Sequence, residues 1–157
     1  MKQRKDNRLK HFDYSSPGSY FITICVKDRK PILSTIIPNE NVFQSPKINL
    51  TQYGEVVDNA IKNIPSIYPV ISLEKYVIMP EHLHLLLRIR TDENGLAVQA
   101  PSIDRVIKQF KSYVTKQIGF SLWQRTYFDH IVRGIDDYNN IWEYINNNPI
   151  NRKKHNT

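Results

Sequence analysis

Hydrophobic and polar residues alternate with the two-residue period of a β-strand in five stretches of the chain. The alternation is clearest in the first stretch, where β-branched and aromatic side chains follow a Pro-Gly turn. The third and fourth stretches are separated by little more than Pro80, so we expect them to form an antiparallel pair. Residues 28–41 and 91–101 have the composition of loop-like inserts. The five predicted strands cover residues 18–26, 42–50, 70–79, 82–90 and 127–132.

In three other stretches, apolar residues recur every three or four positions, which is the spacing of the buried face of an amphipathic helix. The residues expected to begin and end these helices are Thr51 and Pro65 for the first, Ser102 at the start of the second, and Asp136 or Asp137 and Pro149 for the third. The resulting order, β-β-α-β-β-α-β-α, predicts the fold class: an α+β domain with a ferredoxin-like antiparallel sheet and helices packed on one face.

The composition is that of a single domain that folds without covalent or metal support. The chain has 157 residues, of which 40% are hydrophobic, and a core of ordinary size can form at that length. The single cysteine, Cys25, excludes an intramolecular disulfide framework and a zinc site built from cysteines, and it favours a reducing, cytoplasmic setting. No apolar run reaches the roughly 20 residues that span a bilayer. We therefore expect residues 1–157 to form one domain outside the membrane.

The excess positive charge lies at the two ends of the chain. Of a formal net charge of +7, residues 1–10 hold five basic side chains against one acidic, and residues 151–157 hold three basic and no acidic ones. Residues 11–150 therefore carry equal numbers of both signs. Basic tails suit either solubility or contact with a polyanion.

A second basic surface lies on the polar face of the second predicted helix. Such a face could follow a phosphate backbone, or it could be an ordinary solvated face opposite a stripe of core residues. Its basic residues are Arg105, Lys108, Lys111 and Lys116.

Two histidines, His82 and His84, are separated by one residue in the fourth predicted strand. Residues two apart in a strand project from the same face, so both imidazoles can converge on one divalent cation. The alternative is a pair of half-exposed sheet histidines with no ligand. The chain has neither the H-E-x-x-H helix of zinc proteases nor the H-x-E with C-x-x-C of zinc deaminases. A third metal ligand must therefore come from elsewhere in the chain.

The third predicted helix carries a tyrosine at the border between its apolar and polar faces. At 100° per residue, Tyr144 lies about 60° outside Ile141, and Asn148 lies one turn further along on the same side. A tyrosine at such a border usually has a buried ring and a solvated hydroxyl. Its position alone gives no reason to regard it as a nucleophile.

Four segments occur in one order along the chain: RLKHFDYSSPGSYFITI from Arg8, YVIMPEHLH from Tyr76, WQRTYFDHIVR from Trp123 and EYINNNP from Glu143. Together they resemble the small single-tyrosine transposases of the HUH endonuclease superfamily. The most similar branch is that of the REP-associated tyrosine transposases and their relatives among the insertion-sequence transposases. The resemblance runs over nearly the whole chain.

The resemblance implies a metal-dependent enzyme that cleaves single-stranded DNA at specific sites and transfers the strand. It makes Tyr144 the nucleophile, which forms a 5′-phosphotyrosine intermediate. It makes His82 and His84 ligands of Mg²⁺ or Mn²⁺, and imidazole ligands favour Mn²⁺ of the two. The third ligand falls on Asn148, where well-known insertion-sequence members have a glutamine.

The same resemblance implies the partners of the protein. They are single-stranded DNA that forms a hairpin and, where the protein is a possible homodimer, a second copy of the chain. The location that it implies is cytoplasmic, in association with the nucleoid. Arg4, Lys5 and Arg8 in the N-terminal tail become candidates for contact with the base of a hairpin. The main alternative function is a non-catalytic nucleic-acid-binding module derived from such a transposase, and a third is an unrelated metal hydrolase.

Two residues near these candidates have alternative interpretations. Glu81 either orients the imidazole beside it or is a solvated turn residue. His130 is either a proton carrier or phosphate contact in the site, or a structural residue of the last strand.

Overall fold

The computed structural model describes residues 17–38, 40, 46–92, 94–96 and 99–155, and the side chains among them up to Pro149. Four strands form one sheet in the order β4-β5-β1-β6 with antiparallel neighbours, and β2 and β3 form a separate two-stranded ribbon. The elements are β1 (Gly18–Cys25), the 3₁₀ turn η1 (Lys27–Arg29), β2 (Ser34–Ile37), β3 (Lys47–Leu50), α1 (Gln52–Ile67), β4 (Ile71–Ile78), β5 (His82–Ile89), α2 (Ile103–Ile118), β6 (Phe128–Ile131) and α3 (Gly134–His155).

The four-stranded sheet and its helices confirm the predicted fold class. The order β1-α1-β4-β5-α2-β6 is the β-α-β-β-α-β arrangement of ferredoxin-like domains. The predicted antiparallel hairpin is formed by β4 and β5, with Ile78 opposite Leu83 at its closed end. Among the described residues, no helix is both long enough and apolar enough to span a bilayer.

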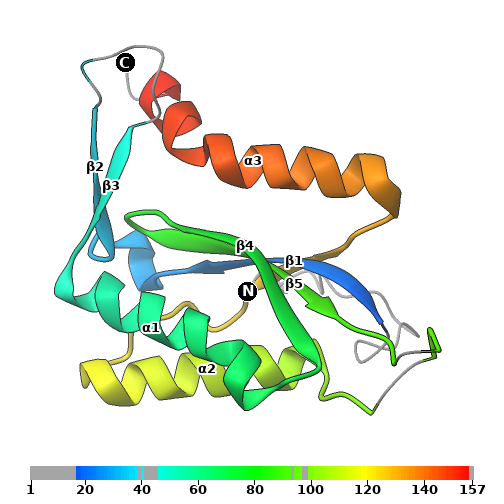
Figure 1. Ribbon diagram of the computed structural model, residues 1–157. Coiled ribbons are helices and arrows are strands. Elements are labelled where there is room, and N and C mark those ends of the chain that lie inside the picture. The colour runs from blue at the N-terminus through cyan, green and yellow to red at the C-terminus, as the bar shows by residue number, and fades with distance from the viewer. Residues whose placement is uncertain (1–16, 39, 41–45, 93, 97–98, 156–157) are drawn as a thin grey trace, which may run out of the picture.

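The helices divide between the two faces of the sheet (Figure 1). Helices α1 and α2 lie on one face, as expected. The prediction that all helices pack on one face is wrong for α3, which lies across the other face. The reason is that β5 is apolar on both sides: Leu83, Leu85 and Leu87 belong to the core under α1 and α2, while Leu86 packs with Phe21 and the α3 residues. Strand β5 is thus buried on both faces, which its run of three leucines reflects.

The predicted helix starts are confirmed for α1 and α2. The hydroxyl of Thr51 accepts a hydrogen bond from the Gly54 N–H, and that of Ser102 accepts one from the Arg105 N–H. These bonds satisfy N–H groups that have no partner inside the helix. Helix α3 begins at Gly134 instead, which places both aspartates proposed as its cap in the first turn.

The predicted helix ends at two prolines are wrong. Helix α1 continues through Pro65 to Ile67, and α3 continues through Pro149 to His155. A proline removes one backbone hydrogen bond, but the residues before it remain packed: Ile64 and Asn148 are both buried.

Two strand predictions also need correction. Strand β2 lies inside the stretch expected to be a loop-like insert. The strand expected at residues 42–50 is reduced to β3, and residues 42–45 of it lie outside the described part of the chain. The two strands of the ribbon pair with each other and not with the main sheet. Each is only four residues long, so a long alternation of apolar and polar residues is not needed to form them.

Candidate active site

The two histidines lie at the start of β5, on the face of the sheet that α3 covers. Their rings are 4.8 Å apart between centroids, so the prediction that they share a face is confirmed. His82 is 9% exposed and His84 is 4% exposed. The alternative of half-exposed histidines is therefore excluded.

His84 has one ring nitrogen engaged and one without a partner. Its Nδ1 lies 2.8 Å from the hydroxyl of Thr23, which is directly opposite on β1. Its Nε2 is buried and has no hydrogen-bond partner among the described residues. Burial, and secondarily the neighbouring His82, lower the pKa of His84 to about 3. A neutral imidazole with a free buried nitrogen suits metal ligation, and buried polar atoms in native structures rarely lack a partner.

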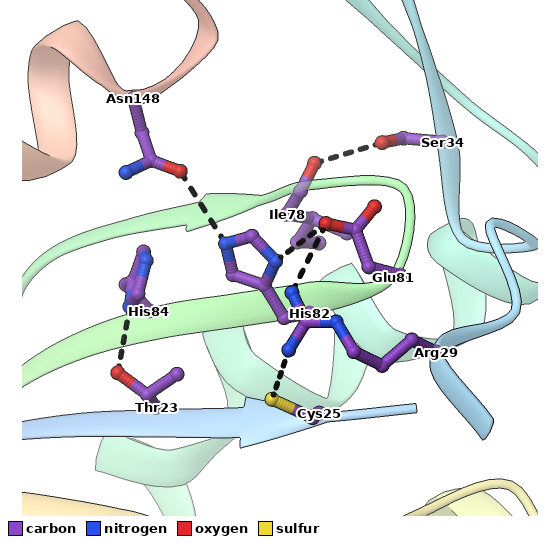
Figure 2. A network of polar contacts seen from close by, with 9 residues as sticks. All are labelled: Thr23, Cys25, Arg29, Ser34, Ile78, Glu81, His82, His84 and Asn148. Carbon is purple, nitrogen blue, oxygen red and sulfur yellow. Dashed lines mark hydrogen bonds and ion pairs between the residues drawn. The ribbon is translucent and has the colours of Figure 1, made fainter. Parts of the chain in front are cut away.

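His82 has polar neighbours at both ring nitrogens (Figure 2). Its Nδ1 lies 3.0 Å from Oε1 of Glu81, and its Nε2 lies 3.4 Å from Oδ1 of Asn148. Burial lowers the pKa of His82, although Glu81 opposes that effect. Asn148 is buried and reaches the pair from α3.

The residues present fit a divalent cation through two imidazoles and one amide. No cluster of three or more His, Cys, Asp or Glu side chains that could hold a metal occurs in the described part of the chain. Asn148, which the resemblance made the third ligand, lies within reach, with its Oδ1 3.4 Å from Nε2 of His82. Imidazole nitrogen and amide oxygen are ligands that Mn²⁺ and other divalent first-row transition metals accept.

Tyr144 lies beside the histidines, one turn before Asn148 on α3. Its ring centroid is 5.3 Å from that of His84 and 6.1 Å from that of Phe21, and the side chain is 48% exposed. Phe21 in turn stacks on His84 at 5.2 Å. The structure thus brings together, within one chain, all four residues that the resemblance selected as nucleophile and metal ligands.

Glu81 is buried, which excludes its interpretation as a solvated turn residue. It is 4% exposed, and its Oε1 faces both His82 and Arg29, the latter at 3.4 Å. The remaining interpretation, an orienting contact to His82, agrees with this geometry. The contact with Arg29 comes from η1, and no local sequence signal indicates it.

His130 is held by the first turn of α3. Its Nε2 lies 2.8 Å from Oδ2 of Asp137, and the same oxygen accepts a hydrogen bond from the Arg133 N–H at 2.8 Å. The bond from Arg133, followed by that from His130, lowers the pKa of Asp137. These contacts fasten β6 to α3 and favour the structural interpretation of His130.

Helix α2, which carries the predicted basic face, lies on the opposite side of the sheet from α3, the helix that covers the histidines (Figure 1). Arg105, Lys108 and Lys116 are exposed, and Lys108 is paired with Asp104 at 3.0 Å. Lys111 is half-buried, and burial lowers its pKa. Its Nζ donates to the backbone carbonyls of Gln124, at 2.7 Å, and Arg125, at 3.3 Å. The structure therefore separates this face from the candidate site, and Arg4, Lys5 and Arg8 lie outside the described residues.

Comparison with known proteins adds sequence relatives. No protein-family model matches the chain. A protein of Haemophilus influenzae described only as uncharacterized is 35% identical over 96% of this chain and 90% of its own length. A putative REP-associated tyrosine transposase of the same organism is 25% identical over 88% of this chain and 73% of its own length. A REP-associated tyrosine transposase of Escherichia coli K12 is 22% identical over 87% of this chain and 69% of its own length.

Two solved structures share the fold. One is described as a REP-associated tyrosine transposase bound to a REP hairpin; it aligns with a TM-score of 0.66 over 97% of this chain and 74% of that chain, at 19% identity. The other, described as a putative transposase from Deinococcus radiodurans, aligns with a TM-score of 0.51 over 94% of this chain and 97% of that chain, at 16% identity. At these identities the likeness shows the fold.

Proposed function

Because this chain belongs to the family of the REP-associated tyrosine transposases, we propose that it is a metal-dependent enzyme that cleaves and transfers single-stranded DNA. The observation that carries the proposal is the convergence of Tyr144 on His82, His84 and Asn148. The tyrosine can supply the nucleophile of a phosphotyrosine mechanism, and the two imidazoles and the amide oxygen can supply the ligands of an assisting cation.

Tyr144 acts as the nucleophile in this proposal. Its phenolic oxygen forms a bond to the scissile phosphorus, and its proton is released to solvent. The bond from phosphorus to the preceding 3′-oxygen breaks, and that oxygen leaves as a 3′-hydroxyl with a proton taken from water. The phosphate remains on the enzyme as a 5′-phosphotyrosine. With a pKa of about 10 in solution, a phenol is also a good leaving group when another 3′-hydroxyl attacks, so that strand transfer needs no external energy source.

His82, His84 and Asn148 act as the ligand set. A cation held there, Mg²⁺ or Mn²⁺, would supply Lewis-acid polarisation of the phosphate oxygens. The burial that keeps both imidazoles neutral also keeps their lone pairs available. Phe21 stacks on His84 and holds the ring against the sheet.

The site is complete within one chain in this proposal. The same α3 helix supplies Tyr144 and Asn148 to the histidines of its own β5. A homodimer is therefore not needed to assemble nucleophile and ligands, whether or not the protein dimerises.

The proposed substrate is single-stranded DNA that forms a hairpin. The support is the solved relative whose structure is described as bound to a REP hairpin. Phosphate contacts are proposed for two groups of basic residues, those of the N-terminal tail and those exposed on α2. They are Arg4, Lys5, Arg8, Arg105, Lys108 and Lys116.

The test is covalent capture of end-labelled hairpin DNA in Mn²⁺ on a denaturing gel. We expect DNA labelled at its 3′ end to become attached to the protein, and DNA labelled at its 5′ end to be released with a free 3′-hydroxyl. Tyr144→Phe should abolish the adduct, whereas Tyr113→Phe, a change at an exposed tyrosine of α2, should not. Attachment of the 5′ label, or an undiminished adduct with Tyr144→Phe, would contradict the mechanism. Hairpin binding without any adduct would favour the non-catalytic binding module.

A further inference from the structure

We propose that Glu81 and Arg29 are positioning residues that hold His82 in the tautomer with its proton on Nδ1, so that the Nε2 lone pair faces the ligand site. The inference rests on the proposed function for its purpose, namely metal ligation. The tautomer itself is a property of the metal-free protein.

The backbone of Glu81 is fixed at the closed end of the β4–β5 hairpin. The carbonyl of Glu81 accepts a hydrogen bond from the Val26 N–H at 2.9 Å, and that of Pro80 accepts one from the Leu33 N–H at 3.0 Å. Val26 and Leu33 lie on either side of η1. The chain before β2 therefore wraps around the hairpin turn and fixes its position at two successive residues.

The carboxylate of Glu81 decides which nitrogen of His82 carries the proton. A neutral imidazole has one N–H donor and one acceptor nitrogen, whereas a carboxylate only accepts. With the proton on Nε2, the Nδ1 lone pair would face a carboxylate oxygen at 3.0 Å, two acceptors in contact. With the proton on Nδ1, that contact is a charge-assisted hydrogen bond. The shorter distance and the charge both favour the second tautomer over a hydrogen bond to Asn148 at 3.4 Å.

At the other ring nitrogen, Nε2, this tautomer places one hydrogen-bond acceptor opposite another. In this tautomer the Nε2 lone pair points toward Oδ1 of Asn148, and neither atom can donate to the other. His84 presents a further buried nitrogen without a partner close by. A cation held by His82, His84 and Asn148 would accept these lone pairs, and the orientation of the His82 ring would therefore matter to the site.

Arg29 supports Glu81 from the surface. Its Nη2 lies 3.4 Å from Oε1 of Glu81, and its Nη1 lies 3.4 Å from the sulfur of Cys25, the residue opposite His82 on β1. Both Asp28 and Arg29 have left-handed backbone conformations, with φ of 58° and 51°. Such conformations persist in non-glycine residues only where the surrounding structure requires them. Here they accompany the turn that brings the Arg29 guanidinium back to the Glu81 carboxylate.

The first measurement is the tautomer of His82 by ¹⁵N NMR in the full-length, metal-free protein, with its signals assigned by their loss in His82→Ala. In the wild type we expect the imidazole proton of His82 on Nδ1. In Glu81→Gln we expect the population to shift toward the tautomer with that proton on Nε2. Glu81→Asp should restore part of the wild-type signal. Glu55→Gln, the same change at an exposed position of α1, should leave the tautomer unchanged.

The second measurement is the affinity for Mn²⁺ alone, by electron paramagnetic resonance. Loss of the carboxylate partner of a metal-bound histidine typically weakens metal binding about 10- to 100-fold, and we expect a loss of that size for Glu81→Gln. Arg29→Ala, which removes a side chain that is 55% exposed, should fall between this variant and the wild type.

Two results would overturn the inference: a wild-type His82 with its proton on Nε2, or a Glu81→Gln protein with unchanged tautomer and unchanged Mn²⁺ affinity. Failure of the proposed function is a different result. It would appear as a wild-type protein that forms no adduct with hairpin DNA, whatever the tautomer of His82.

Discussion

At the scale of single residues, the burial of His84 predicts how the stability of the metal-free protein depends on pH. Its pKa is about 3 in the folded chain against an ordinary value of 6.5. The unfolded chain therefore binds a proton at a pH where the folded chain does not. The stabilising contribution is fully present above pH 6.5 and is lost as the pH falls from 6.5 toward 3. Each pH unit well inside that window costs about 1.4 kcal/mol of free energy of unfolding from this residue.

Urea titrations between pH 3.5 and 7.5 measure this slope. We expect His84→Gln to flatten it, because glutamine does not titrate. Mn²⁺ should raise stability at pH 7 and lose its effect as protons displace it. Equal slopes for the wild type and His84→Gln would contradict the prediction.

The sequence predicts the environment of a residue well only where that environment is set by residues nearby in the chain. The period of a strand was enough to place His82 and His84 on one face. Glu81 could not be assigned, because Arg29, which contacts its carboxylate, belongs to η1 and lies more than fifty residues earlier in the chain. Lys111 has the sequence signature of an exposed basic residue, but the carbonyls it binds come from the loop that follows α2.

At the scale of elements, α3 joins the fold to the candidate chemistry. Its apolar stripe, Ile141 and Ile145, packs on Phe21 and Leu86 of the sheet. Tyr144 precedes Ile145 by one residue, so any loss of that packing displaces the proposed nucleophile. The contact of α3 with the sheet should therefore matter to stability and to catalysis together.

Ile145→Ala tests this coupling. Ile145 is 1% exposed, and the cavity left by such a truncation typically costs about 2–5 kcal/mol. We expect a loss of that size in chemical denaturation, together with a lower yield of the DNA adduct. Ile135→Ala is the matched control in the same helix, since Ile135 is 69% exposed and should change stability by less than about 0.5 kcal/mol. An Ile145→Ala protein with full adduct yield would separate the packing of α3 from the proposed reaction.

Element boundaries show which signals are local. The caps Thr51 and Ser102 were predictable because a capping hydroxyl acts within three residues of itself. The effect of Pro65 and Pro149 was not, because a helix can pass a proline when the residues around it are held by tertiary packing. The short strand β2 was missed for a similar reason, since its partner β3 supplies the hydrogen bonds.

At the scale of the whole molecule, the sheet has two faces with different compositions. The face under α1 and α2 is a continuous apolar core, whereas the face under α3 combines Leu86 with His82, His84 and Thr23. The strict alternation of β5 is broken at Leu86, which indicates burial on both sides. That α3 is the helix that covers this side could not be predicted, because its amphipathic stripe fits either face.

The arrangement of α3 over its own sheet predicts that the chain acts without help from a partner's tyrosine. If the site forms within each chain, a coexpressed mixture of Tyr144→Phe and His84→Ala proteins should give no DNA adduct. Every site in the mixture then lacks either the tyrosine or a histidine, because neither can come from a second chain. If α3 instead reached the site of a second copy, mixed dimers would contain one intact site and the adduct would return. A wild-type dilution series provides the control: the adduct yield per chain should not depend on protein concentration while DNA and Mn²⁺ are saturating. Restored adduct in the mixture would contradict the intrachain site, although the ring of Tyr144 lies 5.3 Å from that of its own His84.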